Sequence, residues 1–276
     1  MSPGDGGGFF TLRRADRVAT ITVADAETRE GPRRSGGSVH WEFAALLNRL
    51  RTDNSVRVIV ITGARDGEFW APPPRRVEGA AHSVTHRTDP AALWRTFSGI
   101  IQLHQSLIEI EKPVVARVNG DAVGTGSSVL LGSDLSVAVE DAIVVDHHLG
   151  LGELAGYGSS FGMVPGDGGA SLVPLHMTPA RAKEYLMLAR PYRARELADL
   201  GLINRAVPAG GLDLAVDDIV ERLLRRPAYA LAWTKRVLNR RAAGQLNLTA
   251  DAAAGYEMVT YLQHELQEDT RSRELE

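Results

Sequence analysis

Two adjacent histidines and one aspartate are the residues of this sequence whose types and spacing best suit acid–base chemistry. His147 and His148 follow a short apolar run, and Asp167 lies in a Pro-Gly-Asp-Gly-Gly turn beyond a Gly- and Ser-rich stretch. Histidine is the side chain whose ordinary pKa suits proton transfer near neutral pH. A carboxylate bonded to a histidine fixes its tautomer and stabilises the imidazolium. The pattern suggests a histidine base with a carboxylate partner; the alternative is two half-exposed loop histidines and an aspartate that bonds its own turn.

The composition is that of an ordinary globular protein. The chain has 276 residues, of which 44% are hydrophobic and 24% charged, and its formal net charge is -3. No basic stripe with interleaved aromatic residues is present, which argues against nucleic-acid binding. The sequence has no cysteine, which excludes disulfides and thiolate metal sites. No apolar run approaches the roughly 20 residues of a membrane span, and the first residues lack the pattern of a signal peptide, so we expect a cytoplasmic protein.

Strand and helix patterns alternate along the first part of the chain, and helical patterns follow. Strands are predicted at 9–12, 18–23, 56–62, 114–118, 134–139 and 142–145. Helices are predicted at 41–51, 91–110, 127–131, 179–189, 194–200, 212–225, 228–243 and 247–268. Residues 24–39, 67–86 and 120–126 are rich in glycine, proline or polar residues and are predicted to be loops or turns. This order predicts an α/β core over residues 1–200 and a helical region over residues 201–276.

Three stretches of the sequence together resemble the crotonase (enoyl-CoA hydratase/isomerase) superfamily. They are VRVIVITGARDGEFWA, KPVVARVNGDAVGTGSSVLLGSDLSVAVEDA and FGMVPGDGGASLVPLHMTPARAKEYLMLARPYRARELADLGLINRAVP, and the match covers residues 9 to 268. The resemblance implies an α/β fold with a spiral of ββα turns and a C-terminal α-helical region used in trimerisation. A homotrimer or a dimer of trimers is therefore expected. It also implies that two backbone N–H groups stabilise an enolate, usually that of a CoA thioester.

The sequence departs from this family where the hydratases carry their catalytic groups. The first glutamate of the hydratases aligns with Ser128 and the second with His148. One oxyanion N–H aligns with Thr125. The other aligns at about Pro73, which has no N–H, so either that donor shifts to Ala71 or Arg75 or half of the oxyanion hole is missing. We therefore expect an enzyme other than a two-glutamate enoyl-CoA hydratase.

The histidine at the second position and the Pro-Gly-Asp-Gly turn instead resemble the branch that hydrolyses C–C bonds in cyclic β-diketones, typified by 6-oxocamphor hydrolase. The resemblance implies that His148, or His147, acts with Asp167 on water in a retro-Claisen cleavage. It places His40 at a carbonyl-binding position near a helix start. It also brings Glu257 to the pocket from the C-terminal helices.

Further substrate-binding candidates flank these positions. They are Thr125, Ala71, Trp41 and Trp70, with Glu153 and Tyr157 in a Gly-rich segment that looks like an insertion relative to the family. These two residues belong either to a mobile lid or to a solvent-exposed loop. The histidines and aspartates do not have the spacing of a metal site, so neither a metal nor a cofactor is expected.

The sequence predicts an enzyme that acts on a small carbonyl compound through an enolate or oxyanion, with hydrolytic C–C cleavage of a β-diketone as the leading reaction. One alternative is a lyase or isomerase that acts by dehydration, double-bond shift or cyclisation on a CoA- or carrier-linked acyl group. Another is a non-catalytic crotonase-like subunit. Neither nucleic acid nor a membrane is expected as a partner.

Overall fold

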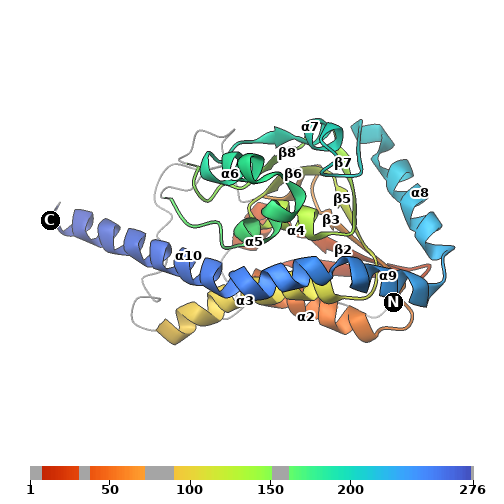
Figure 1. Cartoon of the computed structure of the whole chain (residues 1–276), viewed down its shortest axis with the longest axis horizontal. Coiled ribbons are helices and arrows are strands. Elements are labelled where there is room, and N and C mark those ends of the chain that lie inside the picture. The colour runs from red at the N-terminus through yellow and green to blue at the C-terminus, as the bar shows by residue number, and fades with distance from the viewer. Residues whose placement is uncertain (1–7, 31–37, 72–89, 151–161, 275–276) are drawn as a thin grey trace.

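Two β-sheets with helices packed around them form the molecule (Figure 1). The computed structural model describes residues 8–30, 38–71, 90–150 and 162–274. The strands are β1 (Phe10–Ala15), β2 (Val18–Val23), β3 (Val58–Gly63), β4 (Gly67–Trp70), β5 (Val114–Val118), β6 (Gly120–Val123), β7 (Leu135–Val139), β8 (Ile143–Val145), β9 (Tyr192–Arg193) and β10 (Arg205–Val207). The helices are α1 (Ala26–Glu30), α2 (Val39–Thr52), α3 (Pro90–Glu109), α4 (Thr125–Gly132), α5 (Gly169–His176), α6 (Pro179–Met187), α7 (Ala194–Asp199), η2 (Ala209–Gly211), α8 (Leu212–Leu224), α9 (Ala228–Leu238) and α10 (Arg240–Glu274).

Three strand–strand–helix units follow one another along the chain: β3–β4–α3, β5–β6–α4 and β7–β8–α5. The first strand of each unit joins a sheet of order β1-β2-β3-β5-β7-β10, and the second joins a sheet of order β4-β6-β8-β9. The strands from β2 to β10 of the larger sheet are parallel, and β1 pairs antiparallel to β2 through the predicted hairpin. This repeat is the ββα spiral that the resemblance implies.

The central strand β3 is buried on both faces, as its β-branched run predicts. Ile59 and Ile61 belong to the main core between the sheets and the helices. Val58 and Val60 point to the opposite face, where they belong to a second apolar cluster with residues of α8. Alternate residues of one strand therefore fill two separate layers.

Two stretches predicted to be turns are in fact strands of the smaller sheet. Residues 67–70 form β4 and residues 120–123 form β6, and the two pair in parallel with Gly67 opposite Gly120. A Cβ on Gly120 would lie 1.8 Å from the backbone carbon of Gly67. The glycine that favoured a turn prediction is therefore the residue that allows the two strands to approach. The predicted loop over 24–39 similarly contains the short helix α1.

The C-terminal helices divide at Asn239, and the predicted division between residues 243 and 247 is wrong. The backbone N–H of Asn239 donates to the carbonyl of Lys235 over 2.8 Å, and its side-chain amide donates to the carbonyl of Ile108 over 3.0 Å. Asn239 is the C-cap of α9, and its side-chain bond ties the junction between α9 and α10 to α3. Helix α10 then runs without interruption through Gly244.

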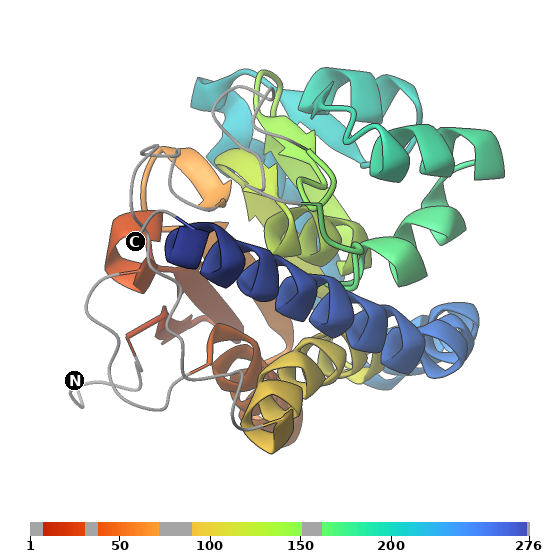
Figure 2. The same cartoon turned by 90° about the vertical axis from the view of Figure 1, so that its left-hand side faces the viewer.

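Helix α10 lies along α3 in both views of the molecule (Figures 1 and 2). Its first half packs Leu246, Ala250 and Ala254 against apolar residues of α3 and α5, namely Ile101, Ile108 and Leu172. Further along, Met258, Tyr261 and Leu262 pack against Leu93, Phe97 and Ile100. This packing fixes the rotation of α10 and therefore the direction in which Glu257 points.

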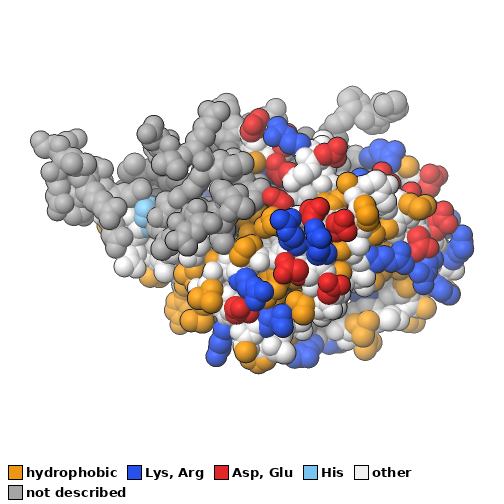
Figure 3. Space-filling model, turned by 90° about the horizontal axis from the view of Figure 1, so that it is seen from above, with side chains coloured by type: hydrophobic (Ala, Val, Ile, Leu, Met, Phe, Trp, Pro, Cys, Tyr) orange, Lys and Arg blue, Asp and Glu red, His pale blue; other side chains and the backbone are white. Residues whose placement is uncertain are grey.

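The surface of the described residues carries charges of both signs. Figure 3 shows Lys and Arg side chains interspersed with Asp and Glu over the face seen from above. No helix among these residues is both long enough and apolar enough to cross a membrane.

Candidate active site

His148 lies just beyond β8, buried between two carboxylates from different elements. Its Nδ1 is 2.7 Å from Oδ1 of Asp146, and its Nε2 is 3.4 Å from Oε1 of Glu257 on α10. Burial alone would lower the pKa of His148, but the two carboxylates together raise it well above its ordinary value. The two neighbouring carboxylates therefore favour the protonated form of His148.

The two carboxylates beside His148 differ in their own protonation. Burial would raise the pKa of Asp146, but the charge and hydrogen bonds of His148, with His147, hold it below the usual value. The pKa of Glu257 is raised, because burial outweighs the opposing effect of His148. Asp146 is thus the ionised counter-ion of the imidazolium, and Glu257 is the carboxylate that protonates more easily.

Asp167 forms a second centre with partners from two other elements. Its Oδ2 accepts a hydrogen bond from the hydroxyl of Thr125 and lies 3.7 Å from Nε2 of His40 on α2. Its backbone carbonyl accepts a hydrogen bond of 2.6 Å from Ser128. Burial would raise the pKa of Asp167, but nearby histidines, His40 first among them, hold it below its usual range.

The sequence predicts that His148 and Asp167 act as a pair, and the structure gives each of them other partners. His148 bonds Asp146, two residues earlier in the chain, because the strand ends there and the backbone turns so that one carboxylate oxygen meets both the N–H and the ring of His148. Asp167 meets Thr125 and His40 instead. The site therefore has two His–carboxylate pairs.

Every glycine of the turn at residues 165–169 makes room for a buried ionisable side chain. A Cβ would lie 2.5 Å from Oε2 of Glu257 at Gly166, 2.3 Å from Nε2 of His104 at Gly168 and 2.2 Å from Oδ2 of Asp146 at Gly169. Gly168 also has a φ of 82°, a left-handed conformation that favours glycine. The turn that carries Asp167 is thus packed on three sides by ionisable groups from α10, α3 and the end of β8.

Sequence reasoning missed two members of this cluster. His104 on α3 is only 1% exposed, and its Nδ1 lies 2.9 Å from the carbonyl of Ile100. Burial lowers its pKa, so it is neutral beside the turn. Asp146 is not among the site residues predicted from the sequence. Its position two residues before a histidine was the signal that could have identified it.

The two segments expected to form an oxyanion hole lie against each other. Thr125 is the first residue of α4, after Gly124 with a φ of 57°. A Cβ on Gly126 would lie 2.0 Å from the carbonyl oxygen of Trp70. Ala71 follows directly and is buried with Val123 and Val145. The first N–H groups of a helix have no partner within the helix, so the start of α4 offers donors at this contact.

Comparison with known proteins identifies the family to which the chain belongs. The family model of enoyl-CoA hydratase/isomerase matches residues 37–273. The chain belongs to the enoyl-CoA hydratase/isomerase family.

Relatives of this crotonase-family protein differ in the chemistry that their names describe. A carnitinyl-CoA dehydratase of Proteus mirabilis is 29% identical over 207 residues, which cover 75% of this chain and 72% of that protein. An enoyl-CoA hydratase/isomerase from Mycobacterium paratuberculosis superposes with a TM-score of 0.73 and 28% identity, covering 94% and 95% of the two chains. A β-diketone hydrolase from the cyanobacterium Anabaena, bound to (S)-3-oxocyclohexyl acetic acid, superposes with a TM-score of 0.73 and 23% identity, covering 92% and 94%. That last likeness is one of fold.

The remaining predicted site residues of this crotonase-family chain lie at varied distances from the cluster. The ring of His147 lies against Gly124, with its centroid 5.0 Å from that of His148. Trp70 is buried in the main core, where its ring packs on Phe10 and Phe43. Trp41 is 39% exposed, and its indole N–H donates to the carbonyl of Arg95 over 2.7 Å. Glu153, Tyr157 and Pro73 lie outside the described residues.

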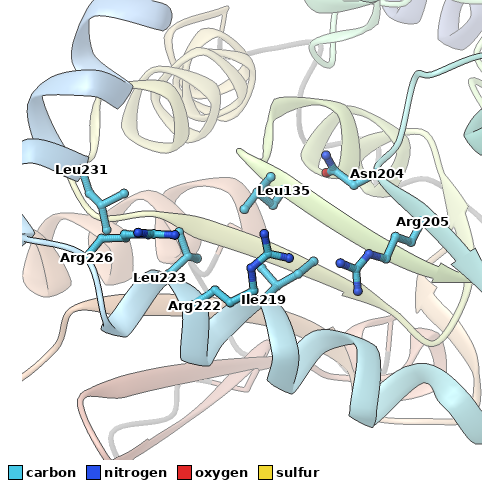
Figure 4. A pocket seen from close by; sticks show the side chains of 8 residues that line it. All are labelled: Leu135, Asn204, Arg205, Ile219, Arg222, Leu223, Arg226 and Leu231. Carbon is cyan, nitrogen blue, oxygen red and sulfur yellow. The ribbon is translucent and has the colours of Figure 1, made fainter.

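A cavity of about 420 Å³ lies elsewhere, between α8 and the larger sheet (Figure 4). Its polar lining includes Arg205 and Arg222, which both contact the carboxylate of Asp218 at 3.0 and 3.6 Å. It contains neither the histidines nor the carboxylates of the crotonase site. Among the described residues, no group of three or more His, Asp or Glu side chains is arranged to hold a metal ion.

Replacing Gly166 with alanine should destabilise the protein by about 1–3 kcal/mol, because the new methyl group would overlap the carboxylate of Glu257 and the carbonyl of Ala253. Chemical denaturation would measure the change. Gly244→Ala is the matched control, since a Cβ there meets nothing within 4 Å. It lies inside α10, so it should stabilise the protein by about 0.5–1 kcal/mol. Equal effects of the two changes would contradict the packing described for the turn.

Proposed function

We propose that this protein is an enzyme that hydrolyses a C–C bond of a β-diketone or related carbonyl compound by retro-Claisen cleavage. One observation carries the proposal: the site has two separate His–carboxylate pairs, the buried pair of His148 with Asp146 and the pair of the half-buried His40 with Asp167, whose carboxylate accepts a hydrogen bond from Thr125 at the start of α4. Addition of water followed by cleavage requires one group to accept a proton and another to donate one. Two pairs with different surroundings can divide these tasks.

The pair of His40 and Asp167 suits the activation of water. Nε2 of His40 is buried and makes no hydrogen bond within the described part of the chain, and it lies 3.7 Å from the carboxylate of Asp167. This separation is longer than a direct hydrogen bond, and a single water molecule can contact both groups. His40 then takes a proton from the water, the hydroxide forms a C–O bond at the carbonyl carbon, and the charge of Asp167 stabilises the imidazolium.

His148 suits the other half of the reaction, in contrast to the role of base that the sequence predicts for it. Its two carboxylate partners raise its pKa and so favour the protonated form, which can donate. The alkoxide collapses, the C–C bond breaks, and the N–H groups at the start of α4 stabilise the enolate that leaves. His148 protonates the enolate carbon. The proton that His40 took from water then passes through solvent to His148, which returns both histidines to their starting states. The sum is one diketone and one water giving one keto acid.

Isotope labelling tests the reaction directly. The purified protein is incubated with a cyclic 1,3-diketone in H₂¹⁸O, and the mass of the product is measured by mass spectrometry. A keto acid whose carboxyl group carries one ¹⁸O from solvent is the expected product, because the nucleophile is water. The Lys183→Gln variant, which changes an exposed residue of α6, should behave as wild type. Absence of ring-opened product across five-, six- and seven-membered diketones would contradict the proposal.

A lyase acting on a CoA thioester is the second candidate, and the 29% identity to a carnitinyl-CoA dehydratase favours it. The same two pairs would then remove a proton and protonate a leaving hydroxyl group. Loss of water from a 3-hydroxyacyl-CoA, seen as the corresponding decrease in mass, would support this reaction. A protein inactive in both assays would match the non-catalytic subunit.

We also propose that the protein assembles as a homotrimer or a dimer of trimers. Large apolar side chains are exposed on α9 and α10, namely Tyr229, Trp233, Val237, Leu238, Leu248, Tyr256 and Val259. Exposed apolar surface of this extent is typical of a contact with another chain. Light scattering gives the mass of the assembly, to be compared with 29.8 kDa for one chain.

A further inference from the structure

Asp146 holds His148 by two contacts to a single oxygen atom. Oδ1 of Asp146 accepts the backbone N–H of His148 over 3.1 Å and lies 2.7 Å from Nδ1 of its ring. The side chains of both residues are almost entirely buried, with 2% and 5% exposed. Two bonds to one oxygen fix both the backbone and the ring, so Nδ1 is committed to Asp146 and Nε2 is directed towards Glu257 on α10.

The Pro-Gly-Asp-Gly-Gly turn fixes the place of this carboxylate from the other side. Oδ2 of Asp146 is buried and makes no hydrogen bond among the described residues. It lies where a Cβ on Gly169 would be only 2.2 Å away. An unpaired buried oxygen costs free energy, so tight packing alone does not explain an aspartate here. The carboxylate is accounted for by the charge that it places beside His148.

Other ionisable groups face His148, but they are less suited to this task. Glu257 is 3.4 Å from Nε2, beyond a short hydrogen bond, and burial raises its own pKa. Asp167 acts on His148 only through its charge and is bonded to Thr125. His147 is the neighbour in the chain and adds no negative charge. Asp146 therefore supplies the main counter-charge.

We propose that Asp146 is the positioning residue of the site, which holds Nδ1–H of His148 and so presents a charged Nε2–H to the substrate. This inference rests on the proposed function for the role of His148 as proton donor. It adds Asp146 to the acid–base groups of the site, although the sequence suggested that His148 pairs with Asp167. It also gives Gly169 a purpose in that machinery, because only a glycine leaves space for the carboxylate.

Histidine NMR titration of Asp146→Asn tests the inference without any substrate. The amide has the shape of the carboxylate and can still accept both N–H groups, but it carries no charge. The signal of His148 is assigned by its loss in His148→Gln. The pKa of His148 should fall by about one unit or more in Asp146→Asn, a tenfold change in its acid dissociation constant. Glu257→Gln, which removes the more distant carboxylate, should lower it less.

Enzyme kinetics provide the second arm of the experiment. The alkaline limb of kcat in Asp146→Asn should move to lower pH by the same amount as the NMR pKa, with KM changed by less than about threefold because binding groups are untouched. An unchanged pKa of His148, with or without a loss of thermal stability, would overturn the inference and leave Asp146 a structural residue.

The inference stays testable if Asp146→Asn does not fold. In the wild-type protein, Nδ1–H of His148 should give a slowly exchanging resonance with a nuclear Overhauser contact to the β-protons of Asp146. Rapid exchange, or no such contact, would overturn it. A pKa that falls as expected in a protein that cleaves no diketone would instead count against the proposed function alone.

Discussion

Replacing His148 with glutamine should lower kcat for C–C cleavage by about 10²–10⁴-fold, the usual contribution of a general acid. Glutamine fills a similar space and can donate a hydrogen bond, but it cannot transfer a proton. The wild-type rate should fall as pH rises through the elevated pKa of His148, because the protonated form is the active one. This alkaline limb should be missing from the residual activity of the variant. Steady-state rates across the pH range would measure both effects.

The control for this change is His176→Gln, which alters an exposed histidine at the end of α5, outside the cluster. It should leave both the rate and the pH profile unchanged. A His148→Gln variant that kept more than about a tenth of the wild-type kcat would show that His148 does not transfer the proton.

Replacing Lys235 with methionine should destabilise the fold by about 3 kcal/mol or more, the usual effect of leaving one partner of a buried ion pair alone. Nζ of Lys235 lies 2.7 Å from Oδ2 of Asp134 and donates to the carbonyl of Lys112 over 3.0 Å. Burial raises the pKa of Asp134 even with Lys235 present. Without the lysine the largely buried carboxylate keeps the backbone N–H of Val114 as a hydrogen-bond donor but loses its counter-charge, and α9 loses this polar contact with the core.

The deficit in the free energy of unfolding should depend on pH with a defined sign. The folded-state pKa of Asp134 is raised above its unfolded value, so the penalty of burying the charge is present at neutral pH and fades as acid protonates the group. Denaturant melts at pH 7 and pH 5 would show a larger difference from wild type at pH 7. Arg225→Gln is the control, because its ion pair with Glu221 is exposed and should contribute less than about 0.5 kcal/mol. A Lys235→Met loss as small as that of the control would contradict the prediction.

The elements that could be predicted from sequence are those whose own residues determine them. The β-branched run before Gly63 gives β3, and the long amphipathic stretch after Pro90 gives α3, as expected from their periodicity. Strands β4 and β6 could not be found this way. Their glycines favour turns locally, and the strands form because Gly120 lets another part of the chain come close. Information about that neighbour is not contained in the local sequence.

The same distinction holds for the site. His148, Asp167 and Glu257 could be singled out because their types and motif positions match known chemistry. Their partners could not, because the choice between Asp146 and Asp167 as the partner of His148 depends on how the chain turns after β8. The place of His104 in the site could not be predicted for another reason. A histidine on an apolar helix face is usually a packing residue, and His104 joins the cluster only because Gly168, from a turn distant in the sequence, packs against its ring.

The close contacts of that turn also constrain the order in which such a site can be acquired. A Cβ at Gly169 and the carboxylate of Asp146 would need the same space, and the same is true of Gly166 and Glu257. In a lineage that changes one residue at a time, each acidic side chain could therefore enter only after the facing position had become glycine. Once the acid is in place, the glycine cannot revert without loss. The glycine and the acidic residue that faces it are therefore epistatic, and neither can be replaced alone without loss of stability or of the acidic group.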